Sequence, residues 1–167
     1  MKYSLKLQGN IAKAYGRDLS ISTKKSVEIC RNIKGMKLEK AKKYLEDVIN
    51  MKRAVAMKRY IRDTAHKKGM ASGRYPVKTA KEILKIIESA EENAKNQGLE
   101  TKNMVVHILA NKAARPWHFG RKRRQKMKRT HIQVVLQEKI YEKDERVQEK
   151  TLSHEREEKN KDKEEKK

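Results

Sequence analysis

Apolar residues recur every three or four positions in three segments of the chain, and this spacing predicts three amphipathic helices. The first should begin near Ser22 and Thr23 and end at Gly35, a residue suited to the left-handed position after a helix. The second should cover about residues 38–50, and the third about 76–97 with a proline in its first turn. The positions expected to form the buried stripes are Val27, Cys30, Ile33, Leu38, Ala41, Leu45, Val48, Ile49, Ala80, Ile83, Leu84, Ile87, Ala90 and Ala94.

Alternation of apolar and polar residues predicts strands in three further segments. Residues 3–8 form a short candidate, and the residues through Gly9, Gly16 and Arg17 should be a loop. Residues 104–111 and 131–137 should pair as a long hairpin, because the basic residues between them have no period. One face of this pair should carry Met104, Val106, Ile108 and Ala110, with Ile132, Val134 and Leu136 on one face of the returning strand.

These elements predict an α+β fold, with three helices packed on a small antiparallel sheet. A long β-hairpin over residues 103–138 should protrude from it. Residues 51–75 are basic and aperiodic, so we expect a loop that becomes ordered on binding a ligand. Residues 139–167 have mixed charge and few bulky apolar side chains, which predicts a charged tail that is disordered or partly helical. The domain should therefore cover residues 1–138.

The charge of the chain indicates a polyanionic partner. Its 167 residues contain 44 Lys and Arg against 22 Asp and Glu, a net charge of +22. The surplus lies wholly in residues 1–137, which carry 34 basic and 11 acidic groups. A compact domain with this charge repels itself unless a polyanion supplies the counter-charge, and nucleic acid is the usual one. No basic amphipathic helix with a bulky apolar face is predicted, so a membrane surface is not an expected partner.

The N-terminal sequence has no apolar run of signal-peptide length, and no stretch approaches the ~20 apolar residues of a membrane span. The single cysteine, Cys30, lies in a helical pattern and should be buried. These features predict a cytosolic or nuclear protein.

The highest charge density lies between the two long strands. From Lys112 to Arg129 there are nine Lys or Arg in eighteen residues, with no Asp or Glu. Arginine pairs with phosphates through two N–H groups and stacks on bases, and Trp117 and Phe119 offer further stacking surfaces. The alternative is a solvated charge run whose aromatic residues fold back. The residues predicted to contact nucleic acid here are Lys112, Arg115, Trp117, His118, Arg121, Lys122, Arg123, Arg124, Lys126, Lys128 and Arg129.

The loop at residues 51–75 is a second candidate surface, in which Asp63 is the one acidic residue. Ordinary surface basicity is the alternative in a chain with this many lysines. The residues predicted to contact nucleic acid here are Arg59, Arg62, His66, Lys67, Lys68 and Arg74.

The sequence gives little indication of metal binding or catalysis. The five histidines lack the spacing that zinc requires. His107 and His131 could face each other across the hairpin, as a structural pair or as a phosphate contact. Glu28 and seven other acids of the helices alternate with lysines, as is typical of solvated helix faces. The chain has no Gly-rich phosphate loop and no nucleophile motif. We expect no enzyme, no metal and no cofactor.

Three stretches, taken in order, carry a family resemblance: STKKSVEICRNIKGMKLEKAKKYLEDVI, GRYPVKTAKEILKIIESAEENAKNQGL, and HFGR followed by THIQVVLQE. Together they resemble the large-subunit ribosomal protein family numbered twenty-two in bacteria and seventeen in eukaryotes. The retained N-terminal strand, the 51–75 insertion and the charged tail resemble archaeal or eukaryotic members and not bacterial ones. At the hairpin tip, RKRRQKMKR is more cationic than the Gly-containing tips that are frequent in the family.

The resemblance implies a structural constituent of the large ribosomal subunit in the cytoplasm, placed on large-subunit ribosomal RNA near the peptide exit. It implies that the hairpin lines the exit tunnel. The implied partners are ribosomal RNA, neighbouring ribosomal proteins and the nascent peptide, without homo-oligomers. Two other functions fit the basic hairpin. One is an architectural DNA-binding protein with a basic β-arm, although such arms usually act in dimers. The other is an RNA chaperone with broad, transient binding.

Overall fold

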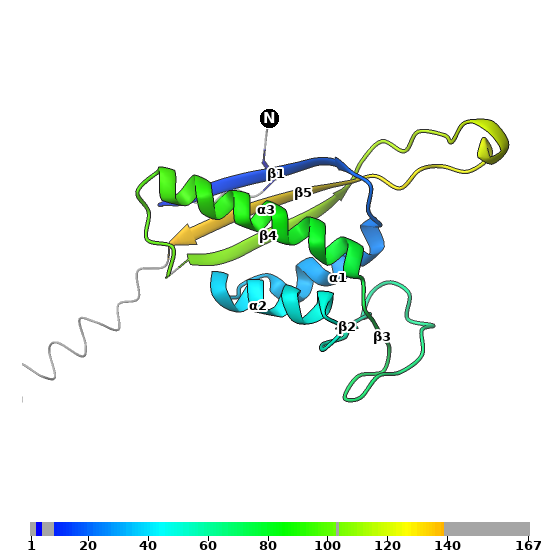
Figure 1. Cartoon of the computed structure of the whole chain (residues 1–167), viewed down its shortest axis with the longest axis horizontal. Coiled ribbons are helices and arrows are strands. Elements are labelled where there is room, and N and C mark those ends of the chain that lie inside the picture. The colour runs from blue at the N-terminus through cyan, green and yellow to red at the C-terminus, as the bar shows by residue number, and fades with distance from the viewer. Residues whose placement is uncertain (1–2, 5–8, 103, 139–167) are drawn as a thin grey trace, which may run out of the picture.

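The computed structural model describes residues 3–4, 9–102 and 104–138 (Figure 1). The predicted tail at residues 139–167 lies outside the described residues. Three strands form an antiparallel sheet in the order β1 (Ile11–Leu19), β5 (Thr130–Glu138) and β4 (Met104–Lys112). A separate two-stranded ribbon consists of β2 (Val55–Ala56) and β3 (Gly73–Arg74).

Three helices pack against one face of the sheet: α1 (Thr23–Ile33), α2 (Leu38–Ile49) and α3 (Val77–Asn96) (Figure 1). The predicted α+β class is therefore confirmed. The helix bounds agree with the sequence pattern to within one residue at most ends, although Pro76 precedes α3 as its N-cap instead of lying in its first turn. Gly35 and Gly98 adopt left-handed φ values of +85° and +70° just after α1 and α3. For Gly35, this is the conformation that the sequence pattern predicted.

The register of β4 and β5 explains where the core lies. Val106 is opposite Leu136 and Ile108 is opposite Val134, so the predicted apolar faces of the two strands coincide. These side chains join the buried helix residues in one cluster. Cys30 belongs to this cluster, and burial raises the pKa of its thiol to about 12. The expectation of a buried cysteine is confirmed.

The N-terminal strand differs from the prediction. The strand is Ile11–Leu19, within the segment expected to be a loop. Tyr3 and Ser4 are not in a strand, and the rest of the predicted 3–8 strand lies outside the described residues.

The reason is the size of the residues that face α3. The inward positions of β1 are Ala12, Ala14 and Gly16, all buried. A Cβ atom at Gly16 would lie 2.4 Å from Cδ1 of Ile86 in α3. The Ile86 side chain therefore fills the space that a side chain at Gly16 would need. Because the three inward residues of β1 are all small, the strand gives almost no periodic signal in the sequence.

The register also corrects the predicted histidine pair. His107 lies opposite Val135, and His131 lies opposite Asn111. His131 instead stacks on Tyr15 of β1, with ring centroids 5.7 Å apart, and its Nδ1 accepts the backbone N–H of Asp18 at 3.1 Å.

Candidate nucleic-acid interface

The connection between β4 and β5, residues 113–129, leaves the end of the sheet and projects from the body (Figure 1). Its two limbs stay in contact beyond the sheet. The Met127 N–H donates to the Pro116 carbonyl at 2.8 Å, and the His118 N–H donates to the Gln125 carbonyl at 2.9 Å. A short 3-10 turn at Gly120–Lys122 closes the connection. The backbone thus presents the basic residues on a narrow two-limbed projection.

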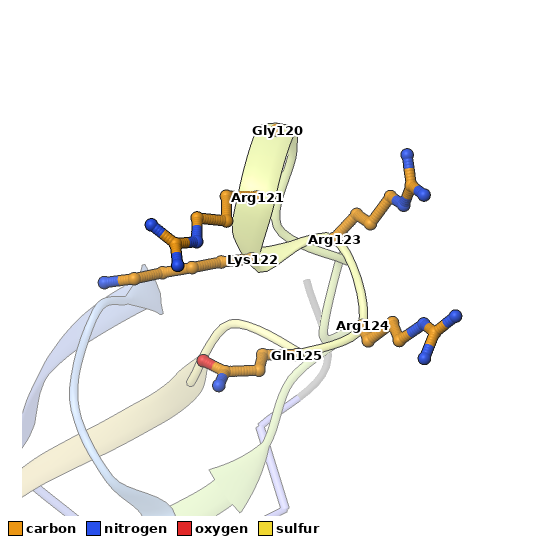
Figure 2. Close-up of a pocket in the computed structure, with 6 residues that line it drawn as sticks. All are labelled: Gly120, Arg121, Lys122, Arg123, Arg124 and Gln125. Carbon is orange, nitrogen blue, oxygen red and sulfur yellow. The ribbon is translucent and has the colours of Figure 1, made fainter.

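Four consecutive cations occupy the tip of this projection, all exposed to solvent. Figure 2 shows Arg121 and Lys122 pointing to one side of the turn, while Arg123 and Arg124 point away on the other. A hollow of about 760 Å³ lies at the turn, lined by Gly120 through Gln125. Because the side chains diverge, the tip can contact phosphates on several sides at once.

Trp117 and Phe119 do not fold back into the core. Trp117 is 59% exposed and Phe119 is 86% exposed. The Lys126 ammonium lies 4.4 Å from the centre of the Trp117 ring, and the two residues form a backbone bridge between the limbs. Two large apolar side chains in this position are available to stack on bases.

The root of the projection forms a second group of cations. Arg115 Nε donates to the Met127 carbonyl at 3.1 Å, and Arg129 Nη1 donates to the Asp18 carbonyl at 3.0 Å. A pocket of about 650 Å³ at this root is lined by Ser22, Thr23, Lys24, Lys25, Tyr60, Ile61, Lys112, Arg115, Lys128 and Arg129. We call it the root pocket.

Lys24 and Lys25 were not among the residues predicted from the sequence. They lie in the first turn of α1, far along the chain from the hairpin, yet they share the root pocket with it. The local signal was the Ser-Thr-Lys-Lys run at the helix start. Nothing in that run indicates that the helix begins beside the hairpin.

The 51–75 loop has internal structure, which its aperiodic sequence did not indicate. Besides the β2–β3 ribbon, the Arg74 Nε donates to Thr64 Oγ1 at 3.1 Å, and the Lys67 ammonium lies 5.7 Å from the centre of the Tyr75 ring. All six predicted nucleic-acid-binding residues of the loop are exposed: Arg59, Arg62, His66, Lys67, Lys68 and Arg74. The loop is therefore a preformed basic surface, separate from the tip.

Glu28 attaches this loop to α1, and its role was missed. It was predicted to lie on a solvated helix face, but it is 1% exposed. Its Oε1 accepts the N–H groups of Arg59 at 2.8 Å and Tyr60 at 2.7 Å, and its Oε2 accepts that of Lys58 at 3.2 Å. Three successive backbone donors converge on one carboxylate because the loop folds over the helix. Ile61 follows at a φ of +58°, unusual for a β-branched residue, at the edge of the root pocket.

Among the described residues, no three His, Cys, Asp or Glu side chains gather as metal ligands do. In the same part of the chain, no helix is long and apolar enough to cross a membrane. Glu91 also has a structural role. It pairs with Lys42 of α2 and, at 3.2 Å, with Lys95, and the hydrogen bond from Lys42 is the main cause that lowers its pKa.

The fold and site define a small basic α+β domain with a cationic hairpin extension and a basic loop beside its root. A family model described as "Ribosomal protein L22p/L17e" matches residues 14–137, and the chain belongs to this family. The resemblance seen in the sequence is thus confirmed.

Several relatives carry the name "Large ribosomal subunit protein uL22". The protein of Methanosphaera stadtmanae is 48% identical over 145 residues, which cover 81% of this chain and 94% of that protein. The protein of Methanocaldococcus jannaschii is 43% identical over 148 residues, which cover 83% of this chain and 95% of that protein. The protein of Methanocella arvoryzae is 50% identical over 105 residues, which cover 60% of this chain and 69% of that protein. These relatives are archaeal, in agreement with the expected archaeal or eukaryotic type.

Proposed function

We propose that this protein is a structural constituent of the large ribosomal subunit in the cytoplasm and binds large-subunit ribosomal RNA. The observation that carries the proposal is the hairpin connection, where nine cations and no acid lie between residues 112 and 129. Such a segment repels itself in water, because neighbouring charges lie well within the ~10 Å screening length at 0.1 M salt. Inside folded RNA the phosphates offset this repulsion, and the release of their counterions favours binding.

The hairpin enters the RNA, and the domain of residues 1–138 lies at the peptide exit. The narrow two-limbed shape of the projection supports this arrangement, because it can pass between RNA helices that would exclude a globular domain. The exposed aromatic residues near its end then contact unpaired bases or the nascent peptide in the exit tunnel. Neighbouring ribosomal proteins complete the surroundings of the domain. The protein acts without catalysis, as a single copy.

Neutralising the tip tests the proposal. In the full chain, the four tip cations are replaced by Gln: Arg121, Lys122, Arg123 and Arg124. Binding to deproteinised large-subunit ribosomal RNA is measured across a salt series. The slope of log K against log salt should fall by up to ~0.9 for each lost phosphate contact, a coefficient taken from duplexes.

A matched control removes the same charge from exposed lysines elsewhere, by replacing with Gln the residues Lys34, Lys40, Lys43 and Lys78. The control should retain most of the parent slope. If the tip variant keeps the parent affinity and slope, the tip does not bind RNA, and the hairpin must be reassigned to a protein neighbour or the nascent chain.

Sedimentation in sucrose gradients tests the assignment to the subunit. The tagged protein should travel with large subunits and survive washing with moderate salt. A chain lacking residues 139–167 should do the same, because the basic surplus lies in residues 1–137. Sedimentation with free RNA or with DNA would instead support the RNA chaperone or the architectural DNA-binding protein.

A further inference from the structure

We propose that the root pocket is a phosphate-binding site of its own, which holds the sugar-phosphate backbone of ribosomal RNA where the hairpin leaves the domain. This inference rests on the proposed function and adds Lys24 and Lys25 to the binding residues. The pocket is assembled from three segments that are distant in sequence: the start of α1, the 51–75 loop and both limbs of the hairpin root. Its ligand is a phosphodiester, not a base edge.

The charges around the root pocket favour an anion strongly. Six of the lining residues are Lys or Arg, and none is Asp or Glu. The ion pairs found in the described residues include neither Lys24, Lys25, Lys112 nor Lys128. Asp18 borders an adjoining hollow, but its carboxylate pairs with Arg17 at 3.3 Å and with His131 at 3.7 Å. Within the part of the chain that the structure describes, the cations of the pocket therefore have no ion-pair partner.

Hydrogen bonds hold the walls of the pocket in place before any ligand arrives. The hydroxyl groups of Thr23 and Thr130 lie 2.8 Å apart, and Thr130 also donates to the Ile21 carbonyl at 3.0 Å. Thr130 is fully buried, so the start of α1 is attached firmly to β5. On the other side, Glu28 fixes the backbone up to Tyr60. A site with fixed walls loses little conformational entropy when it binds.

The shape of the pocket favours the backbone of RNA over a compact free anion. Its volume of about 650 Å³ is several times that of a phosphate ion, and the cations come from different sides. Ser22, Thr23, Tyr60 and Ile61 complete the lining. Lysines and arginines on several sides of one hollow can contact successive phosphates of a sugar-phosphate backbone.

Replacing Lys24 and Lys25 together by Gln in the full chain tests the proposal. The matched control replaces Lys40 and Lys43, two exposed lysines of α2, and removes the same net charge. Binding to deproteinised large-subunit ribosomal RNA is measured across a salt series. The root variant should lower the slope of log K against log salt by up to ~1.8, which corresponds to two phosphate contacts, and the control should lower it much less. Equal thermal midpoints of both variants and the parent exclude loss of folding.

Equal slopes for the root variant and the control would overturn the proposal. A different result would contradict the proposed function, namely that the parent itself shows no salt-dependent binding to this RNA. Hydroxyl-radical footprinting supplies a second readout, because the root variant should expose different nucleotides from those exposed by the tip variant. If both variants expose the same nucleotides, the root pocket is not a separate site.

Competition by inorganic phosphate, measured at constant ionic strength, distinguishes a site for the RNA backbone from a site for free phosphate. It should compete only weakly with RNA for the parent. Strong competition that is lost in the root variant would show a site for free phosphate and overturn the assignment to the RNA backbone.

Discussion

Replacing Glu28 should release the 51–75 loop while leaving the helical core folded. In the parent, Oε1 of Glu28 accepts the N–H groups of Arg59 and Tyr60 at 2.8 Å and 2.7 Å. In Glu28→Gln, the side-chain oxygen can still accept both. The amide nitrogen then takes the place of Oε2 and faces the Lys58 N–H, so that two donors oppose each other. Glu28→Ala removes the acceptors of all three N–H groups.

The magnitude follows from these contacts. A hydrogen bond to a charged group contributes about 1.5–3 kcal/mol, and a buried donor left unpaired costs about 1–3 kcal/mol. For Glu28→Gln, we expect the stability of the docked loop to fall by about 2 kcal/mol. The hydrogen bond from the Lys58 N–H is lost, and the two remaining hydrogen bonds are weaker because their acceptor is no longer charged. For Glu28→Ala, the loss should be larger, but it cannot exceed the free energy of docking the loop, because opening lets water reach the donors.

Hydrogen exchange measures the effect directly. A loss of about 2 kcal/mol should speed the exchange of the Arg59 and Tyr60 amides by about 30-fold, since every 1.4 kcal/mol corresponds to a factor of ten. The amides of α3 should exchange as in the parent. Glu88→Gln, an exposed acid on α3, is the matched control.

Parent-like exchange at these amides in both Glu28 variants would refute the reasoning, because the loop would then be held by other contacts. The RNA affinity of Glu28→Gln adds a functional readout. It should fall together with loop protection, since Tyr60 forms part of the root pocket.

Gly16→Ala should lower the free energy of unfolding by about 1–3 kcal/mol, because its Cβ would lie 2.4 Å from Cδ1 of Ile86; an unchanged urea midpoint would contradict this. The pKa of Glu91 is lowered in the folded state, so its ionised carboxylate stabilises the fold above pH 4.5, and this stabilisation is lost as the pH falls through the folded-state pKa. Acid should therefore destabilise the parent more than Glu91→Gln. Parallel curves of stability against pH for the two proteins would contradict this prediction. Trp117→Ala should weaken RNA binding by roughly 1–3 kcal/mol without changing the salt slope; a changed slope would argue against stacking.

The elements with large apolar side chains were predictable from the sequence. The three helices and the β4–β5 pair repeat such residues at a fixed period, and burial of that face follows from the hydrophobic effect whatever the partner surface is. The concentration of charge between the two strands was equally visible, because nine cations without an acid need no structure to be recognised. The family resemblance also came from local motifs.

What the sequence could not reveal depends on contacts between distant segments. Ala12 and Gly16 belong to a strand because β1 pairs with β5, and their small side chains give no periodic signal from which that pairing could be predicted. Glu28 among lysines has the local pattern of a solvated acid, and only the loop folded over α1 gives it three backbone donors.

The root pocket depends on tertiary structure in the same way. Lys24 and Lys128 are more than a hundred positions apart in the chain, and they share a pocket because the Thr23 and Thr130 hydroxyl groups join α1 to β5. Local periodicity reports which face of an element is buried, since that depends on the element's own side chains. It cannot report what lies against that face, because the partner is set by packing across the whole chain.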